Sequence, residues 1–172
     1  MPTVMTHAVV GVTLGTLTPF RSRVFWILSA TLPVLPDLDV LGLTFGIPFR
    51  SMWGHRGISH SLAVALLIGI VGARLVHRRV GARVAPLALY FALITASHGV
   101  LDAFTNGGPG VALFAPFDDA RYFFPWRPVP VSPLARNFFS GWGLQVLTAE
   151  VLLLWLPAAI VATVALMRRR PS

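Results

Sequence analysis

Long apolar runs separated by short polar turns dominate this sequence, and they predict a bundle of about five membrane-spanning helices. The runs cover residues 5–20, 24–45, 58–76, 84–104 and 141–166. Apolar runs of roughly 17–25 residues match the thickness of the hydrocarbon core of a bilayer. The expected fold class is therefore all-α, a multi-pass transmembrane helical bundle that forms a single integral membrane domain over residues 1–172.

Two of the runs depart from a regular span. Pro33 and Pro36 interrupt the second run. Because proline removes a backbone donor and clashes with the preceding turn, this helix is expected to be broken there. The first run is short and lacks a preceding basic segment, so we expect a retained helix rather than a signal peptide. Gly11 and Gly15 within it predict close helix packing.

A long loop rich in glycine, proline and aromatic residues, 105–140, separates the fourth span from the fifth.

Composition narrows the class of protein further. Hydrophobic residues make up 55% of the chain and charged residues 12%, which favours a membrane protein over a water-soluble one with an unusually apolar core. The net charge of +8 comes from arginine alone. The arginines form short clusters between apolar runs, which is typical of topology determinants and contacts with anionic lipid rather than of nucleic-acid binding. The chain has no cysteine, so imidazole and carboxylate groups would have to hold any metal.

The arginine distribution also predicts an orientation. With five spans, nine arginines fall on one side, in the turns 21–23, 74–83 and 168–170. The other side holds five, which are Arg50, Arg56, Arg121, Arg127 and Arg136. The positive-inside rule then places the basic turns in the cytoplasm and the N-terminus outside. In this topology four of the five histidines and three of the six acidic residues lie towards the outer ends of their spans.

His98 and Asp102 form the first candidate pair. They are four residues apart on a predicted helix, so they share a face, with Cβ atoms roughly 6 Å apart. Such a pair can chelate one divalent ion or bridge two. The alternative is a hydrogen bond that only pins the helix. Because ionisable groups inside a membrane are costly, the functional interpretation is favoured.

A polar stretch before the third span supplies further candidates. His55 and His60 are five apart and flank a glycine, so His55 is expected in the loop and His60 in the first helical turn. Ser59 is a candidate helix cap. Arg56 either binds an anionic group bidentately or faces the lipid headgroups.

The remaining ionisable groups allow more than one interpretation. Asp37 and Asp39 follow the proline break, and because residues two apart cannot share a helix face, one is expected to ligate while the other supports it or acts as a cap. His7 is either a ligand or merely interfacial. Glu150, alone in the fifth span, is a general base, a partner of a ligand or the counter-ion of an arginine. His77, among arginines on the opposite side, is expected to be interfacial.

Aromatic residues mark the membrane interface. Trp53, Trp126 and Trp142 are expected to anchor the outer interface and Trp26 the inner one. The aromatic, proline-flanked segment 114–126 either folds over the site as a re-entrant lid or dips into the headgroups as an interfacial loop.

Several short motifs follow one another in a characteristic order. They are Thr6-His7, residues 35–39 (Leu-Pro-Asp-Leu-Asp), 55–61 (His-Arg-Gly-Ile-Ser-His-Ser), 98–102 (His-Gly-Val-Leu-Asp) with Thr105 and Gly107, Pro116-Phe117, and 121–125 (Arg-Tyr-Phe-Phe-Pro). This order resembles the YdjM-type family of bacterial inner-membrane proteins, described as LexA-regulated, membrane-bound, metal-dependent hydrolases. The resemblance covers most of residues 1–130 and implies a multi-pass hydrolase of the bacterial inner membrane that uses a divalent metal. At the level of its ligands alone, the set is also similar to that of zinc-dependent phospholipase C.

These observations lead to one expected function and two alternatives. The expected metal ligands are His7, Asp37 or Asp39, His55, His60, His98 and Asp102, and the expected catalytic residues are Arg56, Asp39 and Glu150. Six ligands exceed the need of one zinc ion, so either two metals bind or some residues support the ligands.

Zinc is the first choice of metal, and manganese and iron suit the same ligands. The metal would lower the pKa of a bound water, and Arg56 would stabilise an anionic transition state. The expected substrate is a membrane lipid or a lipid-linked phosphoester, met in the outer leaflet. The alternatives are a metal or proton transporter, or a binding protein, with the same cluster, and a structural protein in which His–Asp contacts hold kinked helices together.

Overall fold

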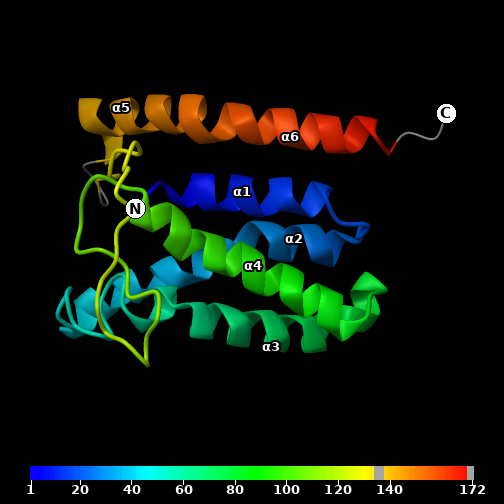
Figure 1. Ribbon diagram of the computed structural model, residues 1–172, viewed down its shortest axis with the longest axis horizontal. Coiled ribbons are helices and arrows are strands. Elements are labelled where there is room, and N and C mark those ends of the chain that lie inside the picture. Colours follow the sequence, from blue (N-terminus) through cyan, green and yellow to red (C-terminus); the bar gives the residue numbers. More distant parts are fainter. Residues whose placement is uncertain (134–137, 170–172) are drawn as a thin grey trace.

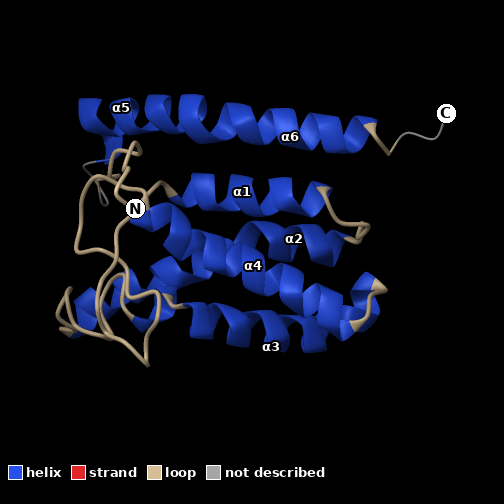
Figure 2. Ribbon diagram, viewed as in Figure 1, coloured by secondary structure: helices blue, strands red, loops and turns tan. Residues whose placement is uncertain are grey.

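The computed structural model describes residues 1–133 and 138–169, and the regular secondary structure of this part of the chain is entirely helical (Figure 2). The all-α prediction is confirmed. The elements are α1 (Val4–Thr16), α2 (Arg23–Thr31), the 3₁₀ segment η1 (Leu32–Phe45), the 3₁₀ turn η2 (Ile58–His60), α3 (Leu62–Val80), α4 (Val84–Ala103), α5 (Gly141–Glu150), the π-helical turn η4 (Val151–Trp155) and α6 (Leu156–Met167). Arg136 and Arg170, which entered the topology prediction, lie outside the described residues.

The helices lie side by side, and successive passes run in opposite directions (Figure 1). The continuous helix formed by α5, η4 and α6 makes an outer layer against α1, while α3 packs along α4. Three helical stretches are long and apolar enough to cross a membrane, namely Arg23–Phe45, Val84–Ala103 and Gly141–Met167, and α1 is a shorter apolar helix. The prediction of about five passes is compatible with this arrangement.

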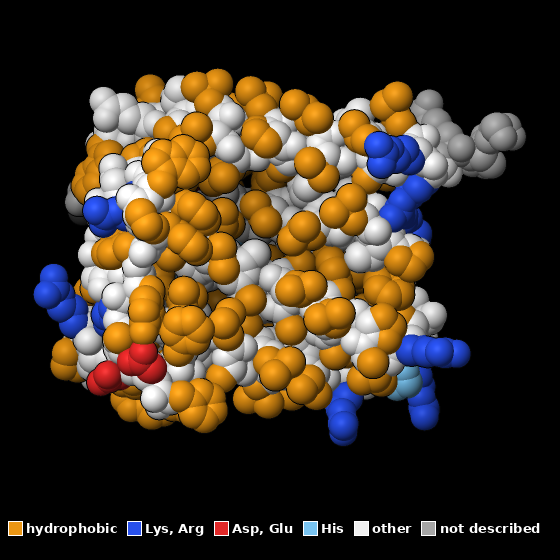
Figure 3. Space-filling model, viewed as in Figure 1, with side chains coloured by type: hydrophobic (Ala, Val, Ile, Leu, Met, Phe, Trp, Pro, Cys, Tyr) orange, Lys and Arg blue, Asp and Glu red, His pale blue; other side chains and the backbone are white. Residues whose placement is uncertain are grey.

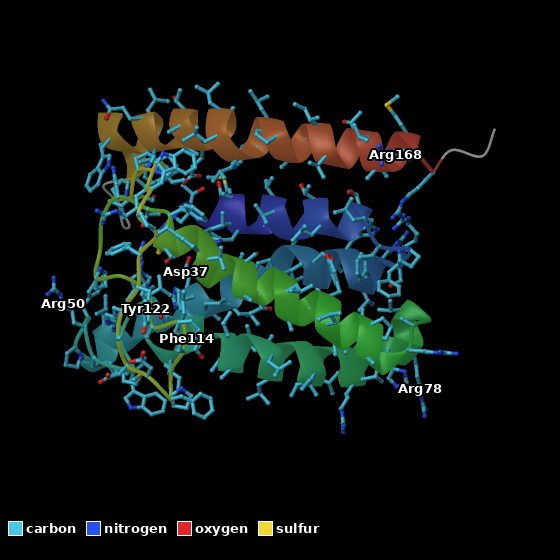
Figure 4. The ribbon with its side chains drawn as sticks, in the orientation of Figure 1. Asp37, Arg50, Arg78, Phe114, Tyr122 and Arg168 are labelled. Carbon is cyan, nitrogen blue, oxygen red and sulfur yellow. The ribbon has the colours of Figure 1, made fainter. Side chains whose placement is uncertain are left out.

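The surface has the character of a membrane protein. Apolar side chains cover the flank of the bundle, and arginines gather at the end away from the long loops (Figure 3). Arg78 and Arg168 lie at that end, whereas Arg50, Phe114 and Tyr122 lie at the loop end (Figure 4). The core of the arginine-rich half is apolar and includes Phe25, Leu87 and Phe91. The polar cluster therefore occupies the other half of the bundle.

The second helix breaks where its prolines predict. The backbone passes from α-helix to 3₁₀ geometry at Leu32, directly before Pro33. In a 3₁₀ helix the carbonyl of Pro33 would accept a hydrogen bond from residue 36, but Pro36 has no N–H. That carbonyl is instead free to accept a hydrogen bond from His98 Nδ1, at 2.7 Å. The pair of prolines thus creates an acceptor for a candidate ligand.

Close packing of α1, predicted from its glycines, is also confirmed. A Cβ built on Gly11 would lie 2.1 Å from the backbone oxygen of Ser29. A Cβ on Gly15 would lie 2.8 Å from the Trp26 ring. The hydroxyl of Tyr90 donates to the carbonyl of Gly11 at 2.9 Å. Helix α1 therefore lies directly against the backbone of α2, and the Tyr90 side chain ties it to α4.

Candidate metal centre

Four separate segments bring ionisable side chains together at the loop end of the bundle. The segments are α1, η1, the stretch from residue 55 through η2, and the last turns of α4. They contribute His7, Asp37, Asp39, His55, Arg56, His60, His98 and Asp102. Seven of these eight residues are buried, and Asp39 is partly buried. Figure 4 shows Asp37 inside the bundle near this end. His77 lies far from this cluster, in the last turn of α3 beside Arg78.

Three ligand-type atoms face one another at the centre of the cluster. His98 Nε2 lies 3.0 Å from His60 Nε2. Asp37 Oδ1 lies 3.3 Å from His98 Nε2 and 3.7 Å from His60 Nε2. Two ligands of one tetrahedral zinc ion stand about 3.3 Å apart, given bonds near 2.0–2.1 Å. The triangle of atoms has the dimensions of one face of a coordination tetrahedron.

The hydrogen bonds made by the Nδ1 atoms of His98 and His60 show that the Nε2 atoms of these rings carry the lone pairs. His98 Nδ1 donates to the Pro33 carbonyl at 2.7 Å, so its Nε2 is unprotonated in the neutral ring. The Ser59 hydroxyl donates to Asp39 Oδ2 at 2.6 Å and therefore accepts from His60 Nδ1 at 2.9 Å. Both Nε2 atoms then present lone pairs to each other, an arrangement that a cation between them stabilises.

Several buried atoms of the cluster have no hydrogen-bond partner in the described part of the chain. They are both ring nitrogens of His7, both carboxylate oxygens of Asp37 and Asp102 Oδ1; Asp102 Oδ2 has the ion-paired guanidinium of Arg56 at 2.9 Å. Leaving a buried polar group unpaired costs about 1–3 kcal/mol, and more for a charged one. A divalent cation satisfies imidazole nitrogens and carboxylate oxygens alike, so the residues present fit a metal.

The candidate ligands form two adjacent groups. One contains His7, His98 and Asp102, and the other Asp37, His55 and His60; within each group the candidate ligand atoms lie within 4.8 Å of one another. The rings of His7 and His98 stack with centroids 3.8 Å apart. Gly99 permits the approach of α4 to η2, because a Cβ there would lie 2.6 Å from the His60 carbonyl oxygen.

Asp37 and Asp39, which the sequence could not separate, occupy different positions. Asp37 faces the Nε2 atoms and receives no hydrogen bond. Asp39 lies behind the imidazoles, where His55 Nδ1 donates to it at 2.8 Å and the backbone N–H of Arg56 at 3.2 Å. Asp37 is therefore placed to ligate and Asp39 to orient His55 and His60.

Two expectations for the polar stretch need correction. Ser59 does not cap α3, because its hydroxyl is directed at Asp39; Ser61 is the cap, and its side chain accepts from Val64 N at 3.2 Å. Arg56 does not face the headgroups, because it is 1% exposed and its Nε lies 2.9 Å from Asp102 Oδ2. A carboxylate at hydrogen-bonding distance is a stronger partner for a buried guanidinium than water at an interface.

Glu150 lies apart from the imidazole cluster. Its carboxylate is fully buried and accepts hydrogen bonds from Thr3 and Thr6 on α1. Among the described residues no arginine pairs with it, so the counter-ion interpretation is replaced by a contact between helices. Thr3 and Thr6 at the start of α1 are the sequence feature that could have indicated this contact, but no sequence pattern links them to Glu150.

The aromatic segment 114–126 packs over the stretch that carries His55 and Arg56. Val111 and Tyr122 exchange backbone hydrogen bonds of 3.0 and 2.9 Å, which close the segment into a loop. Within it, the Tyr122 hydroxyl donates to Asp118 and lowers the pKa of that exposed carboxyl. The segment is therefore attached to the stretch that carries His55 and Arg56.

Arg121 is the residue that fastens the two loops together. Its guanidinium donates to the carbonyl oxygens of Arg50, Ser51, His55 and Arg56 at 3.2, 2.9, 3.2 and 3.1 Å. Sequence reasoning missed this role. A lone arginine inside an aromatic, proline-flanked loop was the available signal.

Replacing Arg121 by lysine is expected to loosen both loops, because one ammonium group cannot span four carbonyls. Hydrogen bonds to charged groups contribute about 1.5–3 kcal/mol each at most, and we expect a loss of about 2 kcal/mol in thermal unfolding of the detergent-solubilised protein. Protease cleavage within residues 48–57 and 110–126 should rise. Arg127→Lys is the matched control, since that guanidinium lies over the Phe123 ring. Equal behaviour of the two variants would contradict the role of Arg121.

Fold and site together define an all-helical membrane protein with a buried cluster of imidazoles and carboxylates at one end of its bundle. The chain belongs to the family described as YdjM inner membrane protein, which it matches over residues 1–171. It is 35% identical over 176 aligned positions to inner membrane protein YbcI of Escherichia coli (strain K12), covering 99% of this chain and 100% of that protein. No solved structure matches the chain. Membership of the family supports a location in the inner membrane.

Proposed function

We propose that the protein is a membrane-embedded hydrolase whose two His/Asp groups each hold a divalent cation, zinc being the first choice, and that it cleaves a phosphoester of a lipid or lipid-linked substrate. The observation that carries this proposal is the set of buried atoms of His7 and Asp37 that have no hydrogen-bond partner in the described part of the chain. A buried imidazole and a buried carboxylate without such partners are otherwise hard to reconcile with a stable fold.

The charge of the cluster supports a cationic ligand. Asp37, Asp39 and Asp102 bring three carboxylates, against the single guanidinium of Arg56. His60 and His98 donate through Nδ1, so each ring faces the carboxylates through Nε2. The buried side chains therefore carry excess negative charge, which divalent cations balance.

The chain's own residues would prepare the site in three ways. Asp39 accepts the Nδ1 proton of His55 directly and orients His60 through the Ser59 hydroxyl, so that the Nε2 atoms remain free to ligate. Arg56 pairs with Asp102 and directs further N–H groups to Gly107 and Thr105; its other N–H groups remain for an anionic substrate group. A cation bound there supplies Lewis acidity and activates water at neutral pH. Burial excludes bulk water and strengthens each of these interactions.

Two adjoining cavities support an amphiphilic substrate. A small cavity of about 80 Å³ is lined by His55 and Arg56, next to the cluster. A larger cavity of about 340 Å³, mostly apolar, shares Met1 and Ser132 with it. Phe139, which lines the larger cavity, is 90% exposed. A polar headgroup suits the first cavity and a hydrocarbon chain the second.

The side of the membrane follows from the arginines. The arginine-rich end of the bundle is opposite the cluster (Figure 4). The positive-inside rule then puts the cluster in the outer leaflet.

Headgroup release from labelled phospholipids and from a lipid-linked pyrophosphate, measured in detergent micelles, tests the proposed reaction. We expect activity that chelation abolishes and a divalent cation restores, and a loss of at least about 100-fold in His60→Ala. His77→Ala, at the opposite end, is the matched control and should retain full activity. Turnover that survives both chelation and His60→Ala would exclude the proposed mechanism.

A metal transporter is the alternative with the same ligands. Transport requires the polar pathway to continue to the other face of the membrane. The buried residues between the cluster and the arginine-rich end, such as Phe25, Leu87 and Phe91, are apolar. We therefore expect no uptake of labelled zinc into proteoliposomes; uptake without hydrolysis would favour the transporter.

A further inference from the structure

We propose that Glu150 is a positioning residue for His7, acting through the N-terminus of α1; this inference rests on the proposed function. The Glu150 carboxylate is fully buried and receives three hydrogen bonds from α1. Thr3 donates from its backbone N–H at 2.6 Å and from its hydroxyl at 2.5 Å, and the Thr6 hydroxyl donates at 2.5 Å. The next residue along the chain is His7.

The position of this carboxylate matches the electrostatics of a helix end. Thr3 is the N-cap of α1. The first turn of a helix carries unpaired N–H groups and a partial positive charge, which favours an anion there. Glu150 supplies that anion from a different span, so the bond fixes where α1 begins relative to α5.

The π-helical turn after Glu150 adds a second contact with the same threonine. Trp155 Nε1 donates to the Thr6 hydroxyl at 2.7 Å. In an α-helix, residues five apart point about 140° away from each other. In π geometry they point only roughly 50° apart. The turn Val151–Trp155 therefore brings Glu150 and Trp155 onto one face, where both bind α1.

His7 depends on this anchor because it has little else to hold it. Neither of its ring nitrogens has a hydrogen-bond partner among the described residues. Its ring stacks on His98, and its Nε2 lies 3.6 Å from Asp102 Oδ1, beyond hydrogen-bond length. Without a cation, the direction of the ring is set by the stack and by the register of α1. His7 is the candidate ligand that lies on α1, so a rotation of α1 would displace its ring directly.

Titration of the full-length, detergent-purified protein with cobalt(II), followed by its ligand-field absorption, tests this role. Glu150→Gln keeps the side-chain volume but removes one accepting oxygen. We expect it to weaken cobalt binding at the His7 group by about 10- to 100-fold and to leave the Asp37 group unchanged. Thr148→Val is the matched control, because this exposed threonine bonds only to Leu144 of its own helix.

A double-mutant cycle separates positioning from general stability. If Glu150 acts through His7, Glu150→Gln should have no further effect on cobalt binding in a His7→Ala background. Its effect on the thermal midpoint of the cation-free protein should persist in that background. Two results would overturn the positioning role and leave the proposed function standing. One is equal cobalt affinity in wild type and Glu150→Gln, and the other is additive loss of cobalt affinity in the double variant. A wild-type protein that binds no cobalt would instead overturn the proposed function, and this role with it.

Discussion

Replacing Asp37 by asparagine is expected to shift the stability of the protein in opposite directions with and without a divalent cation. In the cation-loaded protein the variant loses a ligand, and binding at 100 times the dissociation constant is worth about 2.7 kcal/mol of stability. We therefore expect a loss of about 3 kcal/mol. In the cation-free protein the wild type buries a carboxylate with no hydrogen bond. The amide removes that charge, so the variant should be at least as stable as wild type.

Thermal unfolding in detergent tests this prediction, because it measures the stability of the cation-loaded protein in excess zinc and of the cation-free protein after chelation. Asp118→Asn is the control, because that carboxyl lies in the exposed loop and bonds to Tyr122. The structural alternative makes a different prediction. If Asp37 only formed ion pairs with His60 and His98, asparagine would destabilise the protein equally in both conditions, and that result would exclude the metal interpretation of Asp37.

Replacing Gly11 by alanine is expected to destabilise the contact between α1 and α2 strongly. The new Cβ would meet the backbone oxygen of Ser29 at 2.1 Å and the Pro33 ring at 2.6 Å. The Ser29 backbone oxygen cannot move aside as the end of a flexible side chain can, so α1 must move away from α2. We expect a loss of about 3 kcal/mol, the upper end for overpacking, and weaker cation binding because His7 moves with α1.

Gly72→Ala is the matched control for this prediction. Gly72 lies within α3, and a Cβ there would find no atom closer than 3.5 Å. Alanine is favoured over glycine in a helix by about 1 kcal/mol, so this variant should be as stable as wild type or more so. A Gly11→Ala protein with a wild-type thermal midpoint would show that α1 does not pack as described.

The sequence was sufficient for features that follow from local rules. Apolar run length predicted the spans, because bilayer thickness sets helix length. Pro33 and Pro36 predicted the break in the second helix, and the four-residue spacing of His98 and Asp102 predicted a shared face. The segments that carry the candidate ligands meet in the structure, as the topology predicted by placing their polar ends at one level of the membrane.

Other features depend on side-chain directions that no local pattern encodes. Asp37 and Asp39 are separated by a single leucine, and their roles become distinct only when η1 turns one towards His98 and the other towards His55. The bonds from Arg121 to the stretch 50–56 join residues about seventy positions apart. Glu150 and Trp155 both face α1 because a π-helical turn lies between them, and that turn has no simple sequence signature.

Metal analysis of the detergent-purified wild type beside His98→Ala, by mass spectrometry after equilibration with zinc, tests the central claim most directly. His98 is the best comparison because its Nε2 contacts both His60 and Asp37. We expect about two divalent cations per wild-type chain and about one fewer in the variant. A wild-type protein that retains no divalent cation under these conditions would contradict the claim that cations hold the buried imidazoles and carboxylates together.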